Sequence, residues 1–110
     1  MFSRDLKKGS AELLVLSLLE ARQRHGYELG KLIELRSQGR ISFRIGSLYP
    51  ILFRLENKGL IIGRWVERSG ERRRRYFRLT AEGRKVLAAQ RSVWKDFVIT
   101  VNRIVRPHHA

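Results

Sequence analysis

The sequence of 110 residues contains no cysteine, and its 10 acidic residues are far outnumbered by 24 lysines and arginines. Without cysteine the chain has no disulfide framework, no thiolate metal site and no cysteine nucleophile. No apolar run approaches the roughly 20 residues that a membrane-spanning helix needs. Residues 1–10 mix charges and lack the apolar segment of a signal peptide. We therefore expect a small cytoplasmic domain.

The charge balance points to an anionic partner. The formal net charge is +14, whereas solubility of a small domain calls for only about 2–8 units. The charge is also concentrated, because residues 64–85 carry nine lysines and arginines against three glutamates. Such a segment indicates a surface for nucleic acid or for an acidic membrane. No stretch joins a strong apolar face to a basic face throughout, which argues against a membrane.

No arrangement of side chains typical of an active site is present. Ser17 lies in an apolar stretch, without the Gly-x-Ser-x-Gly turn that exposes a catalytic serine. A glycine-rich phosphate loop is also missing. His108 and His109 are adjacent in a tail after Pro107, and no carboxylates accompany them as metal ligands. We expect a protein that is not an enzyme and uses no cofactor or metal, with the lone His25 in a structural role.

Apolar periodicity predicts four helices. Ser10 and Thr80 are expected to cap the first and the last of them, because a hydroxyl can accept a hydrogen bond from the first turn. The second helix opens at residues 25–26 and is expected to stop at Gly39. Pro107 ends the last helix.

The third helix is predicted from about Gly46 to Lys58, with Pro50 in or near its first turn, where proline is tolerated. β-branched and aromatic residues mark three strands. These predicted strands cover residues 41–43, 61–67 and 74–79. The last two are joined by a polar turn that contains glycine, which is a hairpin signature.

The order of the elements predicts a mainly α fold with a small β-hairpin. Three helices followed by a two-stranded wing form a winged helix-turn-helix, in which the second helix of the pair reads the DNA major groove. We assign residues 1–79 to this DNA-binding domain. Residues 80–110 are assigned to a C-terminal dimerisation helix and tail.

Dimerisation is predicted from apolar residues of the last helix at spacings close to a heptad repeat. The first helix is apolar on most sides, as expected in a core or at a subunit interface. The predicted dimer interface consists of Leu14, Leu18, Val86, Val93, Trp94, Phe97, Val101 and Ile104.

Three motifs in this order resemble those of a known family. They are His25-Gly26-Tyr27-Glu28-Leu29, then Gly46-Ser47-Leu48-Tyr49-Pro50 followed by Leu55-Glu56 and Gly59-Leu60-Ile61, then Leu79-Thr80-Ala81-Glu82-Gly83. From about Ser10 to Phe97 the chain resembles short-form PadR-like transcriptional regulators, which have a single C-terminal helix. The resemblance implies a homodimeric repressor that binds duplex DNA sequence-specifically. The wing run from Arg72 to Arg75 is more basic than the family pattern.

Ten residues are expected to contact DNA: Lys8, Arg44, Ser47, Tyr49, Pro50, Arg54, Arg72, Arg73, Arg74 and Arg75. Several have a structural alternative. Tyr49 is placed at the DNA face by the resemblance but could pack on Leu13 and Leu52. Ser47 could serve only as a helix cap, and Arg54 could be solvated beside Glu56.

Two further basic segments have alternatives of the same kind. Two of the four wing arginines should point away from DNA if the strand is pleated. Lys7 and Lys8 precede the predicted first helix, so a disordered basic tail is the alternative to phosphate contact.

Trp94 has two interpretations, packing in the dimer interface or forming a flat wall for a small aromatic or hydrophobic effector. The resemblance supplies the second, because some family dimers enclose an apolar cavity. The alternative for the whole protein is a non-specific nucleic-acid-binding module, chromatin-like or RNA-binding, which the charge alone permits.

Overall fold

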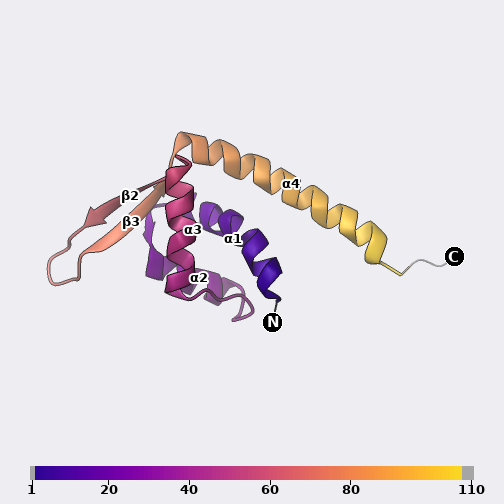
Figure 1. Cartoon of the computed structure of the whole chain (residues 1–110), viewed down its shortest axis with the longest axis horizontal. Coiled ribbons are helices and arrows are strands. Elements are labelled where there is room, and N and C mark those ends of the chain that lie inside the picture. The colour runs from indigo at the N-terminus through magenta and orange to yellow at the C-terminus, as the bar shows by residue number, and fades with distance from the viewer. Residues whose placement is uncertain (1, 108–110) are drawn as a thin grey trace.

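The computed structural model describes residues 2–107, which form four helices and a small sheet. In chain order the elements are α1 (Arg4–Leu19), β1 (Arg24–His25), α2 (Gly26–Arg36), α3 (Ile45–Asn57), β2 (Ile61–Val66), β3 (Arg74–Leu79) and α4 (Ala81–Val105). Helices α1, α2 and α3 form a bundle, the β2–β3 hairpin projects from one side, and α4 extends away on the other (Figure 1). The predicted winged helix-turn-helix with a C-terminal helix is confirmed.

Helix α1 begins at Arg4, so the predicted start at Ser10 is wrong. Ser3 is the capping residue, and its Oγ accepts a hydrogen bond from the Leu6 N–H at 3.3 Å. Asp5 lies in the first turn, where a negative charge stabilises the positive end of the helix dipole. The Ser10 hydroxyl instead donates to the carbonyl of Leu6 at 3.0 Å, inside the helix. Consequently Lys7 and Lys8 lie on a helix and not in a tail before it.

The predicted strand over residues 41–43 is also wrong. The Ser37 hydroxyl accepts from the Ile41 N–H at 2.9 Å and donates to the Ile41 carbonyl at 3.1 Å, which closes a loop after α2. Helix α2 ends at Arg36, three residues before Gly39, the predicted stop. The left-handed residue directly after the cap is Gln38, with φ +56°. Gly39, with φ +78°, follows it and donates its N–H to the Glu34 carbonyl at 2.8 Å.

The sheet contains a third strand that the sequence pattern did not indicate. β1 pairs antiparallel with β3, with Arg24 opposite Phe77 and His25 opposite Tyr76, so the strand order is β1-β3-β2. Through β1 the wing, which we define as β2, β3 and the turn between them, is joined to the start of α2.

The core lies where α1, α2 and α3 meet the sheet. Its largest fully buried side chains come from the three helices, from the sheet and from α4. They include Leu16, Leu29, Leu52, Phe77 and Leu87. Helix α4 meets the core only near its N-terminus. Thr80 caps it as predicted, with Oγ1 accepting from the Gly83 N–H at 2.9 Å. Gly83 is required there, because a Cβ at this position would lie 2.0 Å from the carbonyl oxygen of Leu60.

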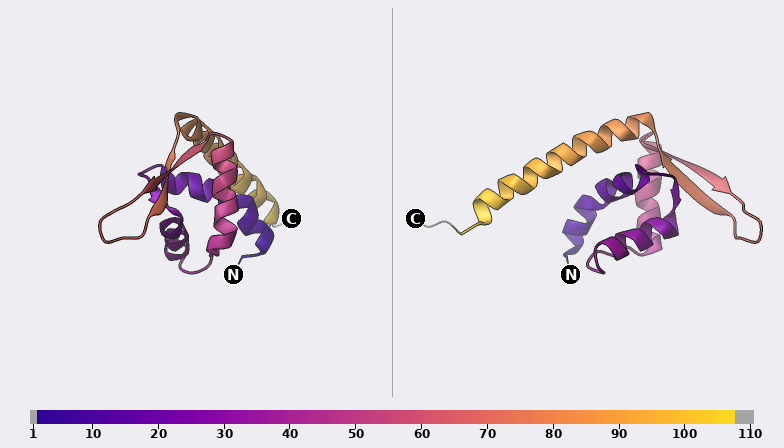
Figure 2. Two further views of the ribbon diagram at one scale, coloured as in Figure 1. Left: turned by 60° about the vertical axis from the view of Figure 1, so that its left-hand side comes forward. Right: turned by 180° about the vertical axis from the view of Figure 1, so that it is seen from behind.

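Beyond this contact α4 leaves the body of the protein, which is why the molecule is 65 Å long but only 29 Å and 21 Å in its other dimensions (Figure 2). Among residues 2–107 no helix has both the length and the apolar character to cross a membrane.

Candidate DNA-binding surface

Helix α3 presents one face to the core and leaves the other free. Leu48, Ile51, Leu52 and Leu55 are buried. Arg44, which precedes the helix, and Ser47 in its first turn are exposed. Since a winged helix contacts base edges with the N-terminal residues of this helix, these two positions have the exposure that the predicted role needs.

Ser47 is not the helix cap. The capping position belongs to Arg44, whose side chain makes no capping hydrogen bond. Neither Arg44 nor the Ser47 hydroxyl has a side-chain partner within the part of the chain that the structure describes. Both are therefore free to bind an external group.

Pro50 is the sixth residue of α3, just past the first turn, and so lies near the first turn as predicted. Its ring nitrogen cannot donate to the carbonyl of Gly46, four residues earlier, where the helical pattern would place a hydrogen bond. Gly46 and Pro50 are both exposed. The exposure of Pro50 is compatible with the predicted proximity to DNA.

Tyr49 is half-buried, and its surroundings favour the packing alternative. A Cβ at Gly26 would lie 3.2 Å from both Cζ and Oη of Tyr49, so the ring rests on the first turn of α2. The ring centroid is 5.9 Å from that of Phe53. Tyr49 also packs against the buried core cluster, to which the predicted contact Leu52 belongs, so it helps to hold α3 on α2.

Arg54 also differs from its prediction, because its acidic neighbour is not Glu56. Arg54 and Lys58 both pair with Glu12 of α1, at 3.4 Å and 3.3 Å. These half-exposed pairs contribute little stability and leave the two cations at the surface.

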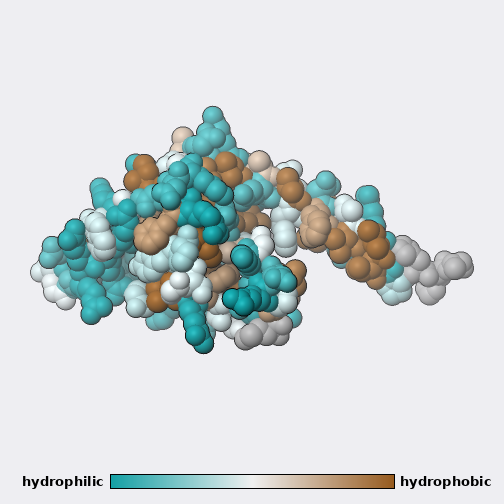
Figure 3. Space-filling view, in the orientation of Figure 1, coloured by the Kyte–Doolittle hydropathy of each residue, from teal (hydrophilic) through white to brown (hydrophobic). Residues whose placement is uncertain are grey.

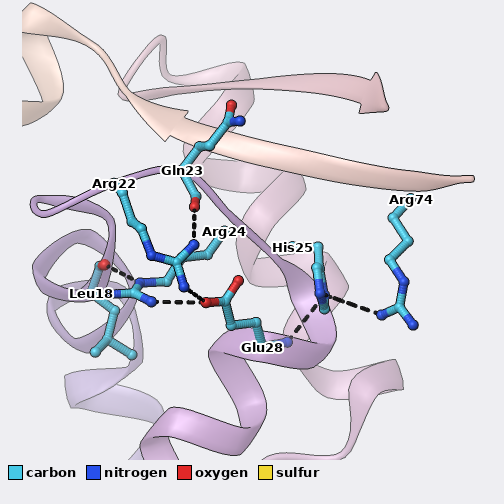
Figure 4. Close-up of polar contacts among 7 residues, drawn as sticks. All are labelled: Leu18, Arg22, Gln23, Arg24, His25, Glu28 and Arg74. Carbon is cyan, nitrogen blue, oxygen red and sulfur yellow. Dashed lines mark hydrogen bonds and ion pairs between the residues drawn. The ribbon is translucent and has the colours of Figure 1, made fainter. Parts of the chain in front are cut away.

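The four wing arginines divide into two pairs. Arg72 and Arg73 lie in the turn and are exposed. Arg74 and Arg75 begin β3, are half-buried, and point to opposite faces of the strand, in line with the pleat. Arg74 Nη1 lies 3.4 Å from each ring nitrogen of His25 (Figure 4).

Arg75 connects the wing to α3. Its Nη2 donates to Glu56 Oε2 at 2.7 Å, and the same oxygen accepts from the Gly63 N–H at 2.9 Å. Gly63 leaves room for this pair, since a Cβ there would lie 2.6 Å from Arg75 Nε. Arg74 and Arg75 are therefore engaged within the protein and set the orientation of the wing. The Arg73 guanidinium lies 4.8 Å from the centroid of the Trp65 ring, but neither Arg72 nor Arg73 has an ion pair among the described residues, so both charges remain exposed.

The connection between α1 and α2 is held in place by a cluster of charged side chains that the sequence did not predict. The buried Arg24 donates to the Leu18 carbonyl at 2.7 Å and to Glu28 Oε2 at 2.9 Å, and Arg22 pairs with the same carboxylate (Figure 4). The only sequence signal was charge in an otherwise polar connection. Leu18 itself is buried in the core of the single chain, which leaves it little surface for the predicted dimer interface.

His25 has the predicted structural role. Its Nδ1 accepts from the Glu28 N–H at 3.2 Å and so caps α2, while its ring meets Tyr76 edge-on at 5.2 Å between centroids. Burial, and next the positive charge of Arg74, lower the pKa of His25 from 6.5. The neutral ring is the form that can accept the capping hydrogen bond.

We predict that the protein loses stability as the pH falls below about 6.5, the pKa of an unfolded histidine. The folded chain has the lower His25 pKa, so the unfolded chain takes up the proton first and is favoured. His25→Asn keeps a capping side chain that does not titrate. Urea unfolding measures the free energy of unfolding at about pH 7.5 and about pH 5.5. This free energy should fall less between the two pH values in the variant than in the wild type. If both proteins lose the same unfolding free energy, the pH dependence comes from titratable groups other than His25.

Helix α4 carries the largest exposed apolar surface. Its side chains Val93, Trp94, Phe97, Val98, Ile99, Ile104 and Val105 are all exposed. All of these except Ile99 fall on one side of the helix, together with Val101, which is half-buried. We call this side the α4 face, and Figure 3 shows its apolar surface along the outer part of the helix. Val86 and Leu14, also predicted at the interface, are partly buried against the core of their own chain.

A groove of about 500 Å³ separates α4 from α1. Trp94 and Phe97 form part of its lining, with their ring centroids 6.1 Å apart, and Leu13 lies on the opposite wall. Residues 2–107 contain no group of three potential ligands for a metal ion. His108 and His109 lie outside the described residues.

Comparison with known proteins gives consistent matches. The family model of the PadR-like transcriptional regulators matches residues 15–89. A transcriptional regulator from Clostridium thermocellum is 29% identical, with a TM-score of 0.87 over 96% of this chain and 100% of that chain. A PadR family regulator from Eggerthella lenta is 33% identical, with a TM-score of 0.79 over 94% and 88% of the two chains.

A PadR-like regulator from Bacillus cereus is similar to the same degree, with 27% identity and a TM-score of 0.80 over 94% of this chain and 99% of that chain. These proteins are transcriptional regulators. The matched region includes the helix-turn-helix, the wing and the first part of α4. The chain therefore belongs to the PadR-like family of transcriptional regulators.

Proposed function

We propose that the chain is a sequence-specific repressor that binds duplex DNA as a homodimer in the cytoplasm. The observation that carries this proposal is the exposed N-terminal part of α3, where the side chains of Arg44 and Ser47 have no partner among residues 2–107, with a basic wing beside it. Each protomer places α3 in a major groove, and the two half-sites lie about one helical turn apart. A dimer bound at a promoter blocks the access of RNA polymerase to that DNA, which is why we propose repression.

The residues divide by role. Arg44 and Ser47 contact base edges, because the first residues of such a helix reach the groove floor. Arg72 and Arg73 lie along the phosphate backbone. Pro50, Lys8 and Arg54 lie nearby, while Tyr49, Arg74 and Arg75 act mainly by positioning α3 and the wing.

The α4 face is the proposed dimer interface. A monomer in water rarely leaves so long an apolar stripe uncovered, and a second α4 at similar spacing covers it by helix packing. In this division residues 1–79 bind DNA and residues 80–110 hold the dimer together.

Binding of duplex DNA should depend steeply on salt. If the dimer meets about 6–10 phosphates, affinity should fall about 10³–10⁵-fold between about 50 and 200 mM salt, because each contact releases condensed counterions. Fluorescence anisotropy with a duplex selected by the protein from a randomised library measures this. A flat dependence would contradict the phosphate-driven model. Equal affinity for random duplexes or RNA would favour the non-specific module.

We also propose that the groove at Trp94 takes a small aromatic or hydrophobic effector, because two aromatic rings line it. N-phenyl-1-naphthylamine, an apolar dye that fluoresces out of water, is a suitable probe. Trp94→Ala should abolish its binding, since a flat stacking wall is removed. Trp65→Ala is the matched control, because Trp65 is the other tryptophan and lies exposed on the wing. Retention of dye binding by Trp94→Ala would exclude this site.

A further inference from the structure

A second groove lies between the N-terminal half of α1 and the start of α3. Its volume is about 610 Å³, and its lining includes five cationic side chains and no carboxylate. We call it the basic groove. Its cations are Arg4, Lys7 and Lys8 of α1, Arg44 before α3, and Arg54 within α3.

We infer that the basic groove binds the DNA backbone on the side of α3 opposite the wing. The phosphates that it binds belong to the segment between the two half-sites. This inference rests on the proposed function and adds a contact region to it. Arg4 and Lys7 become DNA-contacting residues.

The charges in the basic groove are available. Arg4, Lys7, Lys8 and Arg44 form no ion pair within residues 2–107, and only Arg54 is paired, with Glu12 at 3.4 Å. Placing several cations of like charge around one hollow is unfavourable unless an anion occupies it. Phosphate contacts from lysine and arginine supply most of the affinity in protein–DNA complexes.

The position of these charges is fixed by structure and not left to a mobile tail. Ser3 caps α1 through its bond with the Leu6 N–H. The Arg40 guanidinium, in the loop that leads to α3, lies 4.8 Å from the centroid of the Phe2 ring. The first turns of α1 are therefore held beside the start of α3, the helix that enters the major groove.

The two basic surfaces flank α3 from opposite sides. The wing projects from one side, whereas α1 lies on the side toward which α4 runs, in both the front and the rear views (Figures 1 and 2). Arg91 of α4 bonds Ser17 and Glu20 of α1 at 2.9 Å and 3.0 Å, so these two helices are neighbours. Since α4 carries the proposed dimer interface, α1 lies toward the two-fold axis. The wing contacts the outer part of each half-site, and the basic groove faces the centre of the operator.

The test compares Arg4→Ala/Lys7→Ala with a matched control, Arg84→Ala/Lys95→Ala. The control also removes one arginine and one lysine, both exposed on the side of α4 away from the α4 face. With the library-selected duplex, the logarithm of the binding constant is plotted against the logarithm of the salt concentration. The slope of this plot should flatten by about 0.9 for each phosphate that the groove variant no longer neutralises. The control should keep the wild-type slope. Circular dichroism checks that both variants remain folded.

Location is tested with duplexes in which methylphosphonates replace phosphates, which removes their charge. Neutralising the phosphates between the half-sites should weaken binding by the wild-type protein more than binding by the groove variant, which keeps only Lys8, Arg44 and Arg54 of the five cations. Neutralising phosphates at the outer edges should weaken both proteins alike. An unchanged slope, or a groove variant that responds to central neutralisation as strongly as the wild type, would overturn this inference alone. A wild-type protein that selects no duplex would overturn the proposed function and the inference with it.

Discussion

Phe97→Asp is expected to leave the protein monomeric and to lower its affinity for the selected duplex by about 10²–10⁴-fold. The Phe97 side chain is 57% exposed in the single chain, so the substitution does not disturb the core. In the dimer the new carboxylate would be buried without a partner, which is strongly unfavourable. Loss of the dimer removes the second half-site contact and with it the gain from a linked binding event. Light scattering measures the molar mass, and anisotropy measures the affinity.

Ile99→Asp is the matched control for this prediction. Ile99 is also an exposed apolar residue of α4, but helical geometry places it on the side opposite Phe97 and Ile104. This variant should remain dimeric and bind DNA as the wild type does. A monomeric wild-type protein, or dissociation by both variants, would contradict the α4 face as the interface.

The helices could be predicted because burial follows the apolar period. In α3, Leu48, Ile51, Leu52 and Leu55 are buried as their spacing indicates. The errors fall where this signal is absent. The first turns of α1 are polar and solvent-exposed, so they resemble a tail. β1 has two residues, too few to show an alternation, and forms only because β3 lies beside it.

The candidate site was predicted less completely, since neighbours distant in sequence decide which side chains are free. Four consecutive arginines look alike in the sequence, yet Arg74 meets His25, 49 residues away, and Arg75 meets Glu56, 19 residues away. The exposed pair, Arg72 and Arg73, is what remains after these contacts form. Arg4 was missed for the same reason, because only the folded chain brings it and Lys7 beside Arg44.

Arg44→Ala and Ser47→Ala should each cost about 1–3 kcal/mol on the selected duplex and much less on a scrambled one, if each reads a base edge. Neither side chain has a partner among the described residues, so the loss reflects contact with DNA and not a weakened fold. The double variant Arg72→Ala/Arg73→Ala should instead weaken both duplexes alike and flatten the salt slope, because a wing tip lies over phosphates. Paired binding curves at one fixed salt concentration separate the two roles.

Arg84→Ala serves as the control for general loss of positive charge and should change neither curve much, since its exposed side chain belongs to α4 and not to the N-terminal part of α3 or the wing turn. Equal losses on both duplexes for Arg44→Ala and Ser47→Ala would show that the base-reading surface lies elsewhere on α3. A loss confined to the selected duplex for the wing variant would show that the wing itself reads sequence. The physical route would then be an arginine inserted into a narrow minor groove, whose strong negative potential depends on the base sequence.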